Sequence, residues 1–111
     1  MNNSQLLKGV LEGCVLIVIS DDEVYGYELV QKLNKLGFTN LIGGTVYPLL
    51  QKLEKRGDLT SQLKPSSEGP SRKYYSLTPQ GKKQMDEFIN QWHSLELVVN
   101  QIISKKDDQN D

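Results

Sequence analysis

The hydrophobic period of this 111-residue chain changes at Gly57, and this change restricts the possible folds more than any other feature. Before Gly57 apolar residues recur every three or four positions, as in helices, whereas residues 58–77 alternate, as in strands. After Pro79 the helical spacing returns. A chain of this length has room for one core. The sequence therefore predicts a mainly α protein with a small β-hairpin placed before a long last helix.

Three helices are expected before the hairpin, over residues 6–19, 24–37 and 45–57. Gly37 is a natural C-terminal stop for the second helix. Proline is tolerated in the first turn of a helix, so Pro48 predicts that Gly44 or Thr45 is the N-cap of the third helix. The apolar stripes of the three helices are, in chain order, Leu7, Val10, Leu11, Cys14 and Val18; Leu29, Val30, Leu33 and Leu36; and Val46, Leu49, Leu50 and Leu53.

The hairpin is expected over residues 58–77, with its turn in the segment 65–70, which is rich in proline, serine and glycine. Thr78 and Pro79 then predict the N-cap and the first residue of a helix that reaches residue 104. At 1.5 Å per residue this helix is about 40 Å long. Residues 105–111 are predicted to be a disordered tail. An a/d heptad seam along the helix comprises Met85, Phe88, Trp92, Leu95, Val99 and Ile102.

Charge is segregated along the chain although the formal net charge is only -1. The segment from Lys32 to Lys83 holds ten basic and three acidic residues, a local charge of +7. The remaining residues hold three basic and eleven acidic groups, a charge of -8. A basic middle between acidic ends is expected when one face of a protein meets a polyanion. The alternative interpretation of the basic segment is a solvated face.

Several function classes are disfavoured by composition. Cys14 is the single cysteine and lies among apolar neighbours, so a buried thiol is expected instead of redox chemistry. His93 is the single histidine, which leaves no zinc ligand set and no base for a catalytic triad. We therefore expect neither an enzyme nor a metal or cofactor site. The apolar run Val15–Ile19 is too short to span a membrane and no signal peptide is recognised, so a cytoplasmic location is expected.

The exposed face of the third helix has the chemistry of a DNA-reading surface. Small and hydrogen-bonding groups lie near its N-terminus, where recognition helices touch base edges, and cations follow, where phosphates can be met. Arg72 and Lys73 add positive charge on the hairpin. For each cation alone, a solvated surface charge is the alternative. The outward positions are Gly44, Thr45, Pro48, Gln51, Lys52 and Lys55, with Tyr47 and Arg56 at the flanks.

Three segments together resemble the PadR family of bacterial winged-helix regulators. They are YGYEL at 25–29, GGTVYPLLQKLEKRG at 43–57 and RKYYSLTPQGK at 72–82. The resemblance implies a winged helix-turn-helix domain over residues 1–78, with the wing at 58–77, and a C-terminal dimerisation helix over 79–104. It also implies a homodimeric repressor that binds double-stranded operator DNA with an inverted repeat. Tyr47 and Lys52 match DNA-facing positions of the family.

The predicted DNA-binding residues combine the outward helix face, the wing and the start of the second helix. Tyr25 and Tyr27 flank Gly26 at that helix start, where a hydroxyl on a phosphate is one interpretation and an aromatic core anchor is the other. The predicted DNA-binding set is Tyr25, Thr45, Tyr47, Pro48, Gln51, Lys52, Lys55, Arg72, Lys73 and Tyr74.

The first and last helices are predicted to form the dimer interface. By resemblance to multidrug-binding relatives, an aromatic residue at the dimer centre stacks on a planar aromatic effector. The alternative is that Trp92 only anchors the dimer core. The predicted interface comprises Leu7, Val10, Met85, Phe88, Ile89, Trp92, Leu95, Val99 and Ile102, and the predicted effector contacts are Trp92, Phe88, Leu95 and Glu96, with Leu7 and Val10 as further walls.

A competing hypothesis keeps the winged-helix fold but assigns it to protein binding without an effector. A protein-binding version would expose apolar groups on the third helix. Here that face carries Thr45, Gln51, Lys52 and Lys55, which favours DNA.

Overall fold

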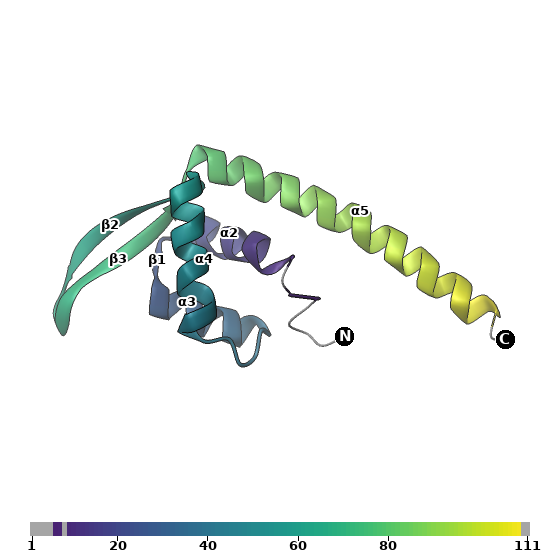
Figure 1. Cartoon of the computed structure of the whole chain (residues 1–111), viewed down its shortest axis with the longest axis horizontal. Coiled ribbons are helices and arrows are strands. Elements are labelled where there is room, and N and C mark those ends of the chain that lie inside the picture. Colours follow the sequence, from purple (N-terminus) through teal and green to yellow (C-terminus); the bar gives the residue numbers. More distant parts are fainter. Residues whose placement is uncertain (1–5, 8, 110–111) are drawn as a thin grey trace.

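The computed structural model describes residues 6, 7 and 9–109. Helices α2, α3 and α4 form a compact head, the β2–β3 hairpin extends from one side of it, and α5 projects on the other side (Figure 1). This confirms a mainly helical winged-helix fold with a long C-terminal helix. No helix in the described part of the chain is both long and apolar enough to cross a membrane. The elements are α2 (Leu11–Asp21), β1 (Val24–Tyr25), α3 (Gly26–Leu36), α4 (Gly43–Arg56), β2 (Leu59–Ser66), β3 (Gly69–Leu77) and α5 (Pro79–Gln109).

The hydrophobic core lies where the three helices of the head meet the base of the sheet. The predicted stripe of α4 is correct, because Val46, Leu50 and Leu53 are fully buried and Leu49 is half-buried. The stripe of α3 is wrong at its end, where Leu36 is 69% exposed. The core side chains are Leu11, Val15, Leu16, Ile19, Val24, Leu29, Leu33, Val46, Leu50, Leu53, Leu59 and Tyr75.

The helix predicted over 6–19 is interrupted, since residues 6 and 7 are helical, Gly9 and Val10 form a turn, and α2 then runs to Asp21; its buried face also differs from the predicted one. Helix α2 starts at Leu11, and it buries Val15 and Ile19 more deeply than the predicted Cys14 and Val18, which are half-buried. Its end is apolar on all sides, so the spacing rule alone does not select the buried face.

The sheet has three strands in the order β1-β3-β2, one more than the predicted hairpin. Val24 and Tyr25, predicted to start the second helix, form β1 and pair with Tyr75 and Tyr74 of β3. The hairpin strands also reach further than predicted, leaving only residues 67 and 68 as the turn. Strand β1 fastens the base of the wing to the start of α3.

Helix α4 begins before the predicted N-cap. Ile42 occupies the N-cap position without a side-chain cap, and its carbonyl accepts hydrogen bonds from Thr45 and Val46 at 3.1 and 3.2 Å. Pro48 therefore lies inside the helix, where it removes the bond that would reach the Gly44 carbonyl. The prediction of Gly44 or Thr45 as N-cap is wrong. Gly44 is exposed, so its carbonyl can be hydrated and the proline is tolerated.

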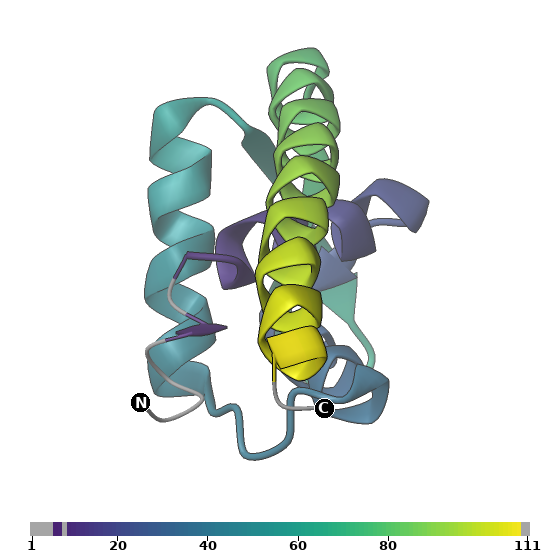
Figure 2. The same cartoon turned by 90° about the vertical axis from the view of Figure 1, so that its right-hand side faces the viewer.

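Helix α5 begins as predicted and ends later. The Gly81 amide donates to Thr78 Oγ1 at 2.9 Å, so Thr78 is the N-cap and Pro79 the first helical residue. The helix continues to Gln109, so the predicted tail is helical over 105–109, and residues 110 and 111 lie outside the described part. At 1.5 Å per residue its 31 residues span about 46 Å. In Figure 2, α4 and α5 stand as two separate columns.

The first turn of α5 is pressed against the end of α4. A Cβ added at Gly81 would lie 2.0 Å from the backbone carbonyl oxygen of Asp58, closer than any real contact. The opposing atom belongs to the backbone and cannot turn away as a flexible side chain would.

We predict that Gly81→Ala lowers the free energy of unfolding by about 3 kcal/mol, the upper end of the usual range for overpacking. Urea or thermal unfolding followed by circular dichroism measures it. Gly69→Ala is the matched control, because a Cβ at Gly69 meets nothing within 4 Å. Equal stability of the two variants would show that α5 is not packed against Asp58 in solution.

Candidate nucleic-acid interface

The outward face of α4 has the composition that the sequence predicts. Gly44, Thr45, Pro48, Gln51 and Lys55 are all exposed. Within the described chain, Lys55 forms no ion pair with a carboxylate, so its full charge is offered to solvent. The hydrogen-bonding and charged groups of this face are thus open to solvent, beside the apolar Pro48.

Tyr47 fixes the approach of α3 to α4 and also borders the surface. Its ring lies in a slot between two glycines, because a Cβ at Gly26 or Gly43 would lie 2.8 or 2.6 Å from ring atoms. The ring nevertheless stays exposed on one side. Glycine at both positions is therefore required by the close approach, and Tyr47 orients the helix that carries the polar face.

A pocket of about 300 Å³ lies where the N-terminus of α3, the middle of α4 and strand β3 meet. Tyr27 is 58% exposed at its edge, so the interpretation of Tyr27 as a core anchor is wrong. The pocket combines phenol groups with two cations at a helix N-terminus, a favourable place for an anion. Its lining residues are Tyr25, Gly26, Tyr27, Tyr47, Leu50, Gln51, Arg72, Lys73 and Tyr75.

Aromatic rings order the cations of the wing. The guanidinium of Arg72 lies 4.5 Å from the centre of the Tyr25 ring, and Tyr25 meets Tyr74 edge to face at 5.5 Å. Lys64 lies 5.1 Å from the Tyr74 ring and pairs with the carboxylate of Glu23. Among the described residues Arg72 has no carboxylate partner, so the ring of Tyr25 holds its position without neutralising its charge.

Lys73 forms an ion pair with α4 instead of extending into solvent. Its Nζ lies 2.8 Å from one carboxylate oxygen of Glu54, and the other oxygen accepts a hydrogen bond from the Ser61 hydroxyl. The hydrogen bonds from Lys73 and Ser61 hold the pKa of Glu54 below its ordinary value of 4.5, and the carboxylate raises the pKa of Lys73. Glu54 thus fastens both wing strands to α4.

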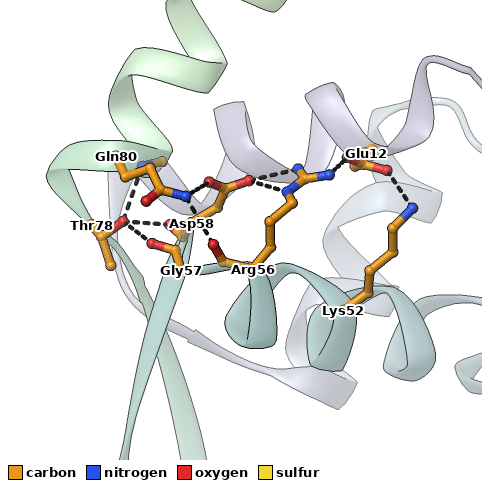
Figure 3. Close-up of polar contacts among 8 residues, drawn as sticks. Glu12, Lys52, Arg56, Gly57, Asp58, Thr78 and Gln80 are labelled. Carbon is orange, nitrogen blue, oxygen red and sulfur yellow. Dashed lines mark hydrogen bonds and ion pairs between the residues drawn. The ribbon is translucent and has the colours of Figure 1, made fainter.

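Lys52 and Arg56 share a single carboxylate on α2. Glu12 lies 3.2 Å from Lys52 Nζ and 2.6 Å from Arg56 Nη1 (Figure 3). Partial burial alone would raise the pKa of Glu12, but the hydrogen bonds from Arg56 and Lys52 outweigh it, so the pKa lies below 4.5. Arg56 also binds Asp58, with nitrogen to oxygen distances of 2.6 and 2.8 Å.

The carboxylates that pair with these cations were missed by the sequence reasoning. Glu12 lies 40 residues from Lys52, and Glu23 lies 41 residues from Lys64. No local spacing signals such pairs, because only the fold brings the partners together. Asp58, two residues after Arg56, is the one partner with a local clue.

The predicted dimer seam divides into two parts. Met85 packs against the core, and the Phe88 ring lies against Gly13 of α2, so these two side chains have partners within the chain. Leu7, Val10 and Ile89 are half-buried. The second half of α5 exposes its apolar side chains, among them the predicted Trp92, Leu95, Val99 and Ile102 and the further Leu97, Val98 and Ile103.

Trp92 borders a pocket of about 430 Å³ between α5 and the N-terminal region. Leu7 and Val10 line this pocket, as predicted, whereas Phe88, Leu95 and Glu96 do not. Phe88 is turned toward Gly13, Leu95 lines a separate hollow with Val98, and Glu96 lies 3.9 Å from His93 Nδ1. The remaining walls of the Trp92 pocket are Leu6, Gly37, Phe38 and Thr39.

Cys14 and the acidic groups show no catalytic arrangement. Burial raises the pKa of the half-buried Cys14 thiol, which keeps it protonated at neutral pH. Within the described residues no three side chains of histidine, cysteine, aspartate or glutamate come together as metal ligands.

Taken together, a three-helix head, an exposed polar recognition helix and a wing that carries cations define a winged-helix DNA-binding protein. The chain belongs to the PadR-like family of transcriptional regulators, whose family model matches residues 15–87. It is therefore a DNA-binding transcriptional regulator and not an enzyme.

Solved structures of bacterial regulators agree with this assignment. A PadR-like transcriptional regulator of Bacillus cereus is 50% identical, with 89% of this chain and 96% of that chain covered and a TM-score of 0.81. A Streptococcus transcriptional regulator is 52% identical, with 88% and 96% covered and a TM-score of 0.80. Bacillus subtilis PadR, crystallised with operator DNA, is 27% identical, with 72% of this chain and 47% of that chain covered and a TM-score of 0.66.

Proposed function

We propose that this protein is a cytoplasmic, homodimeric repressor that places α4 in the major groove of an operator and the β2–β3 wing on the adjoining backbone. The observation that carries the proposal is the exposed polar face of α4 beside the cationic pocket that α3, α4 and β3 form. Bacillus subtilis PadR in complex with operator DNA supports it as a relative with this fold.

Each part of the surface has a distinct task in this arrangement. Thr45 near the start of α4 and Gln51 in its middle offer hydrogen-bonding groups to base edges, and Lys55 meets a phosphate further along. Tyr27 and Arg72 border the pocket at the N-terminus of α3, where a second phosphate fits the helix dipole. The polar character of α4 disfavours the alternative of a protein-binding module.

The DNA contact of Lys55 is tested by salt dependence. We predict that Lys55→Met lowers the slope of log binding constant against log salt by about one unit for each protomer, because each lysine on a phosphate releases about one counterion. Fluorescence anisotropy with a labelled duplex measures this slope. Lys106→Met, a change of the same kind near the end of α5, should leave it unaltered. A wild-type affinity that ignores salt would exclude the proposed contact with the backbone.

We propose that a second copy of the chain packs against the exposed second half of α5. Trp92, Leu95, Val99 and Ile102 follow intervals of three and four, so they lie on one stripe. The same stripe on two chains makes a self-complementary two-fold interface. Two recognition helices related in this way reach successive major grooves about 34 Å apart, which requires an operator with an inverted repeat.

We predict that Leu95→Asp converts the dimer to a monomer at micromolar concentration and abolishes operator binding, because it places an unpaired charge in the seam. Sedimentation velocity measures the first effect. Leu97→Asp is the matched control, since Leu97 is exposed and lies off the stripe. A Leu95→Asp variant that sediments as a stable dimer and binds DNA would rule out this face as the interface.

The pocket at Trp92 is the proposed effector site. Its walls are largely apolar, and Phe38 and Trp92 are two aromatic side chains that a flat ligand can meet. Stacking and cation–π contacts would contribute about 1–2 kcal/mol beyond area burial. Ligand binding would release the repressor from its operator.

Trp92 is the single tryptophan, so its fluorescence reports on this pocket directly. We predict that planar aromatic cations change its emission and weaken DNA binding over the same concentration range. Phe38→Ala should weaken ligand binding while leaving DNA affinity in the absence of ligand unchanged. If neither the emission of Trp92 nor the affinity for DNA changes across a varied panel of planar aromatic compounds, Trp92 only anchors the dimer core and the effector proposal is wrong.

A further inference from the structure

We propose that Glu12 is an internal competitor of the DNA backbone, which binds two cations of the recognition helix and thereby limits the affinity of the protein for DNA. The proposal rests on the proposed function, because it takes α4 as the helix that meets DNA. It concerns Lys52 above all, a residue that the sequence predicts as a DNA contact.

The geometry resembles that of a phosphate between two basic side chains. One carboxylate oxygen of Glu12 lies 3.2 Å from Lys52 Nζ, and the other lies 2.6 Å from Arg56 Nη1. Each oxygen of the carboxylate thus holds a separate cation, as the two free oxygens of a backbone phosphate would. Lys52 belongs to the outward face of α4, so DNA and Glu12 compete for the same ammonium group.

The three side chains of this ion-pair cluster are all partly exposed to solvent. The side chain of Lys52 is 62% exposed, that of Arg56 40% and that of Glu12 29%. An approaching phosphate can therefore replace Glu12 at Lys52 without opening the core. While Lys52 stays on Glu12, its charge is offset within the protein and displaces no counterion from DNA, so this lysine adds little to the salt dependence of binding.

Lys52 and Arg56 differ in what remains after Glu12 is removed. Arg56 keeps the fully buried carboxylate of Asp58 as a partner. Lys52 has no second carboxylate among the described residues. Neutralising Glu12 therefore frees one cation in each protomer, not two.

The test is Glu12→Gln, which keeps the shape of the side chain and removes its charge. Affinity for a mixed-sequence duplex is measured by anisotropy between 50 and 200 mM salt. We expect tighter binding at low salt and a slope steeper by about 0.9 for each protomer, so that the advantage over the wild type shrinks ~3.5-fold per protomer across this range. Asp107→Asn, which removes the same charge at the end of α5, should reproduce neither effect.

Lys52→Met gives an independent measurement that does not require the Glu12 variant to fold. In the wild-type background it should change the salt slope little, because Lys52 is already neutralised. In the Glu12→Gln background it should cancel the whole gain. A loss of about one unit per protomer on Lys52→Met alone would overturn the proposal, since it would show that Lys52 meets DNA as a free cation.

Weaker or unchanged binding by a folded Glu12→Gln variant would likewise overturn it, and Glu12 would then be a residue that orients Lys52 toward DNA. A wild-type protein that binds no duplex in a salt-dependent manner would instead refute the proposed function itself. The two failures are distinguished by the wild-type titration.

Discussion

The buried carboxylate of Asp58 joins the three parts of this protein. It accepts hydrogen bonds from Arg56 at the end of α4 and from Gln80 at the start of α5, and it stands immediately before β2. The backbone repeats the connection, because the Thr78 amide donates to the Asp58 carbonyl at 3.1 Å. The Thr78 hydroxyl donates to the same oxygen at 3.0 Å (Figure 3). A fully buried charge is tolerated only when such partners are all present, and loss of one costs roughly 3–5 kcal/mol. The directions in which the wing and α5 leave the head are therefore fixed together.

The proposed DNA-binding surface uses part of its positive charge in ion pairs within the chain. Lys52, Lys64 and Lys73 each pair with a glutamate from a distant part of the chain, whereas Lys55 and Arg72 form no such pair among the described residues. The paired cations orient the recognition helix and the wing, and the unpaired ones carry the field that attracts a polyanion. Counting basic residues along the sequence overstates the free charge of this face for that reason.

Sequence patterns predicted the elements whose signals are local. The stripe of Val46, Leu50 and Leu53 and the N-cap at Thr78 were confirmed. Strand β1 was missed because two residues have no measurable period, and it exists only because β3 lies beside it. The end of α5 was missed because the apolar seam stops at Ile102, whereas Lys105, Lys106 and Gln109 beyond it are good helix formers.

The candidate site was predicted in its exposed residues and missed in its electrostatics. The outward face of α4 follows from helical geometry alone, so Thr45, Gln51 and Lys55 could be placed without a structure. Glu12 and Glu54 belong to other faces and reach the site only through tertiary packing. The N-cap of α4 was predicted wrongly from Pro48. The carbonyl of Gly44 is exposed to solvent, which lowers the cost of a proline inside the helix.

The apolar side chains in the second half of α5 are not buried by the helices of the head. Residues 90–109 make a helix that is exposed throughout its described side chains, whereas most helices in proteins gain their stability from packing an apolar face. Cover from a second copy, as proposed, supplies the missing burial. In the proposed dimer, the angle at which two α5 helices pack determines the separation of the two recognition helices, because Asp58 and Gly81 fix α5 to the end of α4. Packing in the proposed seam and spacing of operator half-sites are one geometric quantity in that arrangement.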